Sequence, residues 1–87
     1  MKIEKINQET FQQLEISKWP IWTKEVSSFP WKYDQTEICF ILEGEAEISL
    51  QNGEILIINK GDLVTFEAGL CCHWNIRKAI RKHYTFV

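Results

Sequence analysis

Several side chains in this 87-residue chain could carry out chemistry. We single out six of them as candidate ligand-binding residues: Lys32, Glu37, Cys39, Cys72, Trp74 and His83. Carboxylates and imidazoles transfer protons in enzymes, and thiolates act as nucleophiles or bind soft metals. The set therefore allows a binding pocket, an acid–base site or a reactive thiol.

Three of these residues, Glu37, Cys72 and His83, are also the candidate catalytic residues. Glu37 and His83 could exchange protons with a substrate, whereas Cys72 would need a cation such as Lys32 beside it to become a thiolate. The simpler prediction for Cys72 is a core position, because a buried free cysteine usually behaves as a small hydrophobic residue. The simpler prediction for His83 is a structural hydrogen bond.

No metal or other cofactor is expected from the sequence. A zinc site built from Glu37, Cys39, Cys72 and His83 is a chemical alternative, but the spacing of these residues matches no known zinc motif. The chain has three cysteines, of which Cys71 and Cys72 are adjacent. An odd count without a signal peptide predicts reduced thiols in a reducing compartment, and hence a cytoplasmic protein.

Composition limits the kinds of partner that the chain could bind. The formal net charge of −2 provides no basic surface for nucleic acid, and no apolar run is long enough to span a membrane. Residues 77–83 form a local basic run that we interpret as a solvated strand edge. A small-molecule ligand is the expected partner, and a homodimer is a further expectation because a core of this size gives limited stability.

Aromatic residues are abundant, with four Trp, five Phe and two Tyr. Such side chains suit half-buried positions in a β-sheet. Most are expected in the core or at a dimer face, but one or two at a cavity mouth could stack on a planar or sugar-like ligand. The aromatic residues considered for this role are Trp19, Trp22, Trp31, Tyr33 and Trp74.

From residue 26 onward, the sequence predicts short strands separated by turns. Asn52-Gly53 lies between two alternating segments and is a strong hairpin signal. Before this region, Asn7 can cap a short helix that ends near Leu14. The strands are expected at residues 29–33, 36–43, 45–50, 54–58, 63–66, 71–76 and 80–87. This pattern predicts one all-β domain, either a sandwich or a closed barrel.

Two segments resemble the paired motifs of the cupin superfamily. Glu37 and Gly44 have the Glu-to-Gly spacing of the first motif, and Gly61 and Gly69 follow the spacing of the second. The chain is most similar to the cupin-3 subfamily, which is related to the ureidoglycine aminohydrolase cupin domain. The segments that carry this resemblance are residues 18–22, 36–39, 61–66, 72–74 and 82–84. The resemblance implies a single-domain cupin jelly-roll barrel over residues 1–87, with a cupin-3 core at about 18–86.

The chain departs from the family where the family binds metal. Counted from Glu37, the two histidine positions of the first motif hold Pro30 and Lys32, and Cys72 replaces the histidine of the second. Only Glu37 remains, so the resemblance implies a degenerate metal site. One hypothesis is that the Lys32 ammonium takes the place of the cation and pairs with Glu37. The alternative is that Lys32 reaches solvent and that Tyr33 or Trp74 hydrogen-bonds to Glu37.

The alternation of side chains along a strand predicts which of the candidate residues face the same side of the sheet. If Glu37 faces the interior, so do Cys39 and Ile41; if Cys72 does, so does Trp74. The leading functional prediction is a small-molecule-binding barrel with a pocket lined by the six candidate residues. One alternative, implied by the resemblance, is an enzyme acting on a small nitrogen-containing or sugar-like metabolite. Another is a structural or partner-binding protein, and the sequence leaves the question of enzymatic activity open.

Overall fold

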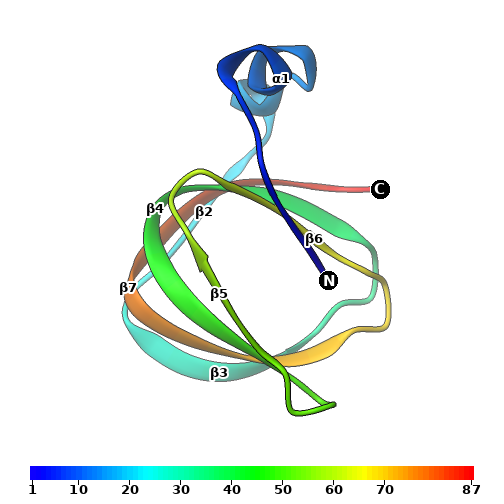
Figure 1. The fold of residues 1–87 in the computed structure, drawn as a ribbon, viewed down its shortest axis with the longest axis vertical. Coiled ribbons are helices and arrows are strands. Elements are labelled where there is room, and N and C mark those ends of the chain that lie inside the picture. The colour runs from blue at the N-terminus through cyan, green and yellow to red at the C-terminus, as the bar shows by residue number, and fades with distance from the viewer.

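The computed structural model describes all 87 residues and is built almost entirely from antiparallel strands. The sheet has seven strands. Five of them follow the order β1-β6-β4-β7-β2, and outside this path β3 pairs with β7 and β5 pairs with β4. Figure 1 shows these strands curving around a common centre, as in a barrel. The elements are β1 (Lys2–Lys5), α1 (Gln8–Gln13), η1 (Ile16–Lys18), β2 (Ile21–Lys24), β3 (Ser27–Lys32), β4 (Glu37–Leu50), β5 (Ile55–Asn59), β6 (Asp62–Phe66) and β7 (Cys71–Phe86). The predicted all-β class is confirmed.

Two long strands, β4 and β7, form the middle of the sheet and pair with each other along most of their length. The sequence predicted each as two shorter strands. Gly44 was expected to bend the chain between two strands; it does bend the chain, but within the single strand β4, where φ is +103° and the β4–β7 register shifts. A bulge of this kind lets a strand curve without ending it.

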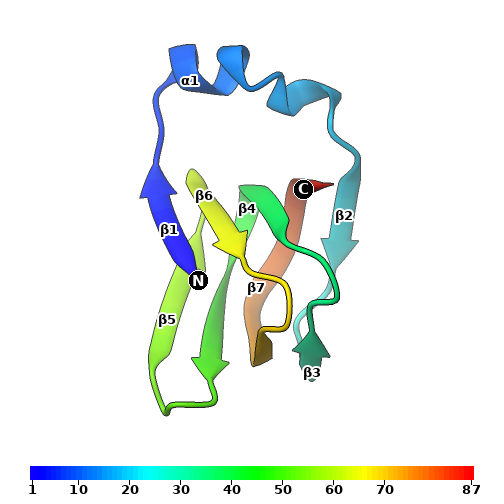
Figure 2. The same ribbon diagram turned by 90° about the vertical axis from the view of Figure 1, so that its right-hand side faces the viewer.

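The predicted local signals at Asn7 and Asn52 are confirmed. The Asn7 side chain accepts a hydrogen bond of 2.8 Å from the Thr10 amide and caps α1. Asn52 and Gly53 form the turn between β4 and β5, and Gly53 adopts φ +89°. Figure 2 shows α1 at one end of the barrel, away from the β4–β5 hairpin. The helix is too short and too polar to cross a membrane, and no other helix of the structure could do so.

The core lies between the inward faces of β4, β6 and β7. It is a cluster of twelve buried residues: Tyr33, Cys39, Ile41, Ala46, Ile48, Ile58, Val64, Phe66, Cys72, Trp74, Ile76 and Ile80. Alternate positions of β4 and of β7 contribute most of the cluster, as the period of two in a strand requires. The same alternation also turns two charged side chains inward, Glu37 of β4 and Lys82 of β7, and they lie beside the core.

Candidate functional site

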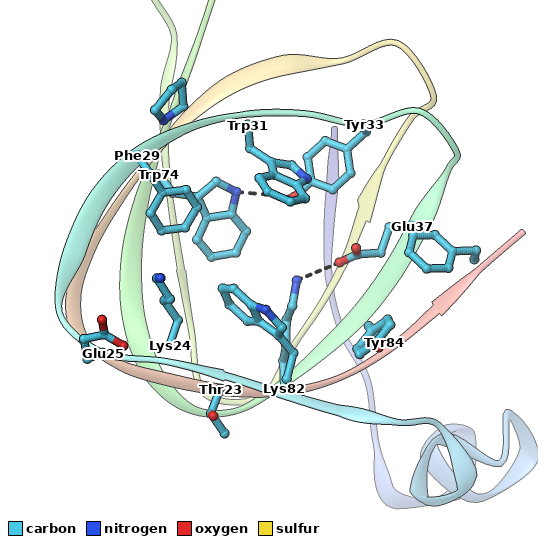
Figure 3. A pocket seen from close by; sticks show the side chains of 13 residues that line it. Thr23, Lys24, Glu25, Phe29, Trp31, Tyr33, Glu37, Trp74, Lys82 and Tyr84 are labelled. Atoms are coloured by element: carbon cyan, nitrogen blue, oxygen red, sulfur yellow. Dashed lines mark hydrogen bonds and ion pairs between the residues drawn. The ribbon is translucent and has the colours of Figure 1, made fainter.

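A cavity of about 670 Å³ lies beside this core. Its volume is in the range that accommodates small ligands. Strands β2, β3 and β7 supply most of its wall, and β4 supplies Glu37. The lining residues are Trp22, Thr23, Lys24, Glu25, Phe29, Pro30, Trp31, Tyr33, Glu37, Trp74, Lys82, Tyr84 and Phe86. Figure 3 shows Lys24 and Lys82 entering the cavity from one wall and Trp31 and Tyr33 from the opposite wall.

A buried ion pair forms one part of the cavity surface. The Lys82 Nζ lies 2.6 Å from Glu37 Oε2, and the side chains are only 6% and 9% exposed. The same ammonium lies 4.8 Å from the ring centroid of Trp22 and 5.1 Å from that of Trp74. Attraction to the two indole faces adds to the ion pair. Lys82 therefore neutralises a carboxylate that would be costly to bury alone.

Aromatic rings make up the apolar part of the wall, with Trp74 at their centre. The rings of Phe29 and Trp74 are nearly parallel, with centroids 6.1 Å apart, and Trp22 meets Trp74 edge-on at the same distance. Tyr33 stacks on Phe66 at 4.6 Å. Offset-stacked and edge-to-face rings stabilise each other, so these side chains form a fixed surface.

Tyr33 is a neutral hydrogen-bonding group in this wall. The Trp74 Nε1–H donates a hydrogen bond of 3.3 Å to the Tyr33 hydroxyl oxygen. Burial, and next the negative charge of Glu37, raise the pKa of Tyr33 well above its ordinary value. The phenol therefore keeps its proton near neutral pH, and that proton remains a donor.

Lys24 is the second ammonium of the cavity. It is half-buried, and its Nζ lies 5.7 Å from the ring centroid of Phe29. No carboxylate of the protein forms an ion pair with it. The neighbouring Glu25 also lines the cavity, but its side chain is exposed and forms no ion pair with Lys24. Lys24 thus presents an unneutralised positive charge to the cavity.

The hypothesis that Lys32 pairs with Glu37 is wrong. Lys32 is exposed and lies opposite Cys71 in the β3–β7 ladder, on the outer face of the sheet. Trp31 lies opposite Cys72 and takes the inward position instead. Glu37 instead pairs with Lys82, which belongs to the basic run at residues 77–83 that was expected to be solvated.

Cys39 and Cys72 lie in the core cluster and do not line the cavity. Burial raises the pKa of the Cys39 thiol to about 12, and it also raises the pKa of Cys72. The positive charge of Lys82 opposes both shifts without cancelling them. These positions agree with the simpler core prediction for Cys72 and provide no activated thiolate.

His83 is buried but outside the cavity, because it alternates with Lys82 and Tyr84 along β7. Its Nδ1 lies 2.9 Å from the carbonyl oxygen of Trp19. A carbonyl can only accept, so Nδ1 carries the proton in this bond. The structural prediction for His83 agrees with this bond. The prediction that His83 lines the pocket as an acid–base group is wrong, because His83 and Glu37 face opposite sides of the sheet.

The residues present do not fit the metal site of the fold. No group of three or more His, Cys, Asp and Glu side chains comes together in the structure. The zinc alternative would require Glu37, Cys39, Cys72 and His83 to converge, but His83 projects from the other face. The ammonium of Lys82 also lies against the carboxylate that a divalent cation would need.

Of the six candidate ligand-binding residues, the structure brings Glu37 and Trp74 to the cavity. Lys82 and Lys24 also line the cavity, and neither was among the candidate residues predicted from the sequence. Alternation counted along one strand could have found Lys82, since it lies an even number of residues after Cys72 and Trp74. No comparable signal marked Lys24. Strand β2 is short and has no buried residue that would show which of its alternating positions face inward.

Comparison with known proteins supports the resemblance seen in the sequence. The EutQ-like cupin domain family matches residues 11–84. A DUF861 family protein from Thermotoga maritima is 50% identical, with a TM-score of 0.97 over 99% of this chain and 98% of that one. A structure described as ethanolamine utilization protein EutQ, from Salmonella typhimurium, is 26% identical, with a TM-score of 0.68 over 76% of this chain and 53% of that one. An RmlC-like cupin from Shewanella frigidimarina shares the fold, with a TM-score of 0.58 and 12% identity over 76% of this chain and 64% of that one.

No curated protein matches the chain. The matched residues and the structural neighbours define a small jelly-roll barrel of the cupin type. The chain belongs to the EutQ-like cupin domain family.

Proposed function

We propose that this chain is a small-molecule-binding barrel and that its ligand occupies the cavity between β2, β3 and β7. The observation that carries the proposal is a cavity of about 670 Å³ that combines a stacked aromatic wall with a buried ion pair. Ligand sites in proteins are typically apolar concavities with a few fixed polar groups. Lys82 and Glu37 are held by each other, so the polar groups are in place before a ligand arrives.

Glu37 and Lys82 also leave hydrogen-bonding capacity for a ligand. Lys82 has three N–H donors and uses one of them on Glu37 Oε2. The second carboxylate oxygen, Oε1, accepts no hydrogen bond from the protein. A ligand with an acceptor and a donor could therefore contact both residues without separating them.

A thermal-shift titration of the full chain tests the proposal. The probes are indole, benzamide, benzoate and glucose, which cover planar and sugar-like shapes. A compound at ten times its Kd stabilises the native state by about 1.4 kcal/mol, which raises Tm by about 6–11 °C in a domain of this size. We expect at least one planar probe to produce a saturable shift, and a flat response to all four would overturn the proposal.

The variant Trp31→Ala locates the binding. Trp31 is 54% exposed, so its removal takes away cavity wall and little core. Ile55→Ala is the matched control, because Ile55 is 59% exposed and lies on β5, away from the cavity. The shift should shrink in Trp31→Ala and persist in Ile55→Ala; an equal shift in both variants would place the ligand elsewhere.

We further propose a cytoplasmic location. All three cysteines are free thiols in the structure, although Cys71 and Cys72 are adjacent. Unpaired thiols persist in reducing compartments.

A further inference from the structure

Lys24 has an unusual electrostatic position among the residues of the cavity. Its ammonium is half-buried, forms no ion pair and lies against the Phe29 ring. Partial removal from water weakens the hydration of a charge, and a ring face at 5.7 Å replaces only part of it. An anionic group bound beside Lys24 would restore that interaction through charge-assisted hydrogen bonds.

Lys82, unlike Lys24, has a carboxylate partner within the protein. Its charge is already neutralised by Glu37 at 2.6 Å, so this part of the cavity offers hydrogen bonds without a net charge. A second negative charge on the ligand would approach the Glu37 carboxylate and be repelled. The two lysines therefore distinguish one charged end of a ligand from a neutral remainder.

The aromatic wall adds a requirement on shape. Phe29, over which Lys24 lies, is nearly parallel to Trp74, with an interplanar angle of 8°. Trp22 meets Trp74 edge-on and completes the surface between the two lysines. Flat groups gain more contact than puckered ones on such faces.

We propose that the cavity selects small planar organic monoanions, with Lys24 as the anion anchor. This inference rests on the binding function proposed above and specifies its ligand class. Lys24 contacts the anionic group, the half-buried Phe29 ring and the exposed Trp31 ring contact the planar body, and the Lys82–Glu37 pair contacts a neutral polar group where the ligand has one.

The test compares benzoate with benzamide, benzylamine and cyclohexanecarboxylate by calorimetric titration of the full chain. Benzamide keeps the planar body without the charge, benzylamine reverses the charge, and cyclohexanecarboxylate keeps the charge without the planar ring. We expect benzoate to bind at least about tenfold more tightly than benzamide, which is the size of one charge-assisted hydrogen bond in a partly exposed site. Inorganic phosphate is the fifth probe, because it has charge without an apolar body and should not compete.

Lys24→Met removes the charge and keeps the apolar stem, and it should abolish the preference for benzoate over benzamide. Lys24→Arg should retain the preference. Lys32→Met is the matched control, because Lys32 is exposed on the outer face and should leave every affinity unchanged.

The outcomes separate this inference from the binding function itself. Equal affinities for benzoate and benzamide, or a preference that survives Lys24→Met, would overturn the anion anchor while the cavity remains a binding site. Competition by phosphate as strong as that by benzoate would overturn the planar requirement. Absence of binding by every probe would overturn both proposals.

Discussion

Lys82 and Glu37 meet inside the barrel, with the ammonium nitrogen 2.6 Å from one carboxylate oxygen and both side chains almost completely buried. They come from β7 and β4, the two longest strands of the sheet. Lys82 supplies the positive charge that the buried Glu37 carboxylate requires. The Lys82–Glu37 ion pair is therefore a fixed polar part of the cavity wall.

Removal of one partner of this pair should be costly. Lys82→Met leaves Glu37 buried without a cation, and we expect the free energy of unfolding at pH 7 to fall by about 3 kcal/mol or more. The double variant Lys82→Met/Glu37→Gln should recover much of that loss, because no charge is then buried alone. Urea denaturation measures the free energy of unfolding of both variants.

Lys78→Met, an exposed position on the same strand, is the control and should change stability by less than about 0.5 kcal/mol. An equally small effect of Lys82→Met would contradict a stabilising pair.

Stability should decline at alkaline pH because two buried acids keep their protons in the native state. Burial raises the pKa of Cys39 from 9.0 to about 12 and raises the pKa of Tyr33 above its ordinary 10.0. The unfolded chain loses these protons at lower pH than the native chain, so it binds fewer protons from about pH 9 upward. Each group then lowers the free energy of unfolding by up to about 1.4 kcal/mol per pH unit. Tyr33→Phe should flatten the curve above pH 10, and parallel curves for the two proteins would rule out Tyr33 as a source.

The three thiols should differ in reactivity. Cys71 is half-exposed, whereas Cys39 and Cys72 are buried, and the pKa values of both buried thiols are raised. Ellman's reagent at pH 8 should therefore modify one thiol quickly in the native protein and all three in urea. Cys71→Ala should eliminate the fast phase. A fast phase that remains in this variant would show that a buried thiol, Cys39 or Cys72, reacts in the native state.

Two glycines with similar φ angles should differ greatly in how much stability is lost when each is replaced by alanine. Gly44 has φ +103°, and a Cβ there would fall on the carbonyl oxygen of Ala79 in β7. Gly53 has φ +89° with open space around the same position. Gly53→Ala should cost only the strain of a left-handed residue, about 1–2 kcal/mol. Gly44→Ala must also move β4 away from β7, so we expect a loss above about 3 kcal/mol or failure to fold. Equal losses in thermal or urea unfolding would show that the close β4–β7 approach is unimportant.

The sequence alone determined the features that depend on local pattern. Alternation on β4 and β7 correctly grouped Cys39 with Ile41 and Cys72 with Trp74, because side chains within one strand must point to alternate faces. The Asn52-Gly53 turn followed from its backbone requirement. The motif spacing around Glu37 and Gly44 indicated the family that the comparisons then showed.

Only the tertiary structure decided which charges meet. Lys32 was placed by counting back from Glu37, but Tyr33 to Thr36 form the connection between β3 and β4, and strand alternation does not continue through it. The backbone bonds of Tyr33 with Gly69 and Leu70 fix that connection, and the β3–β7 register then turns Trp31 inward and Lys32 outward. Lys82 reaches Glu37 because β7 pairs with β4, a contact between residues 45 positions apart that no local pattern specifies.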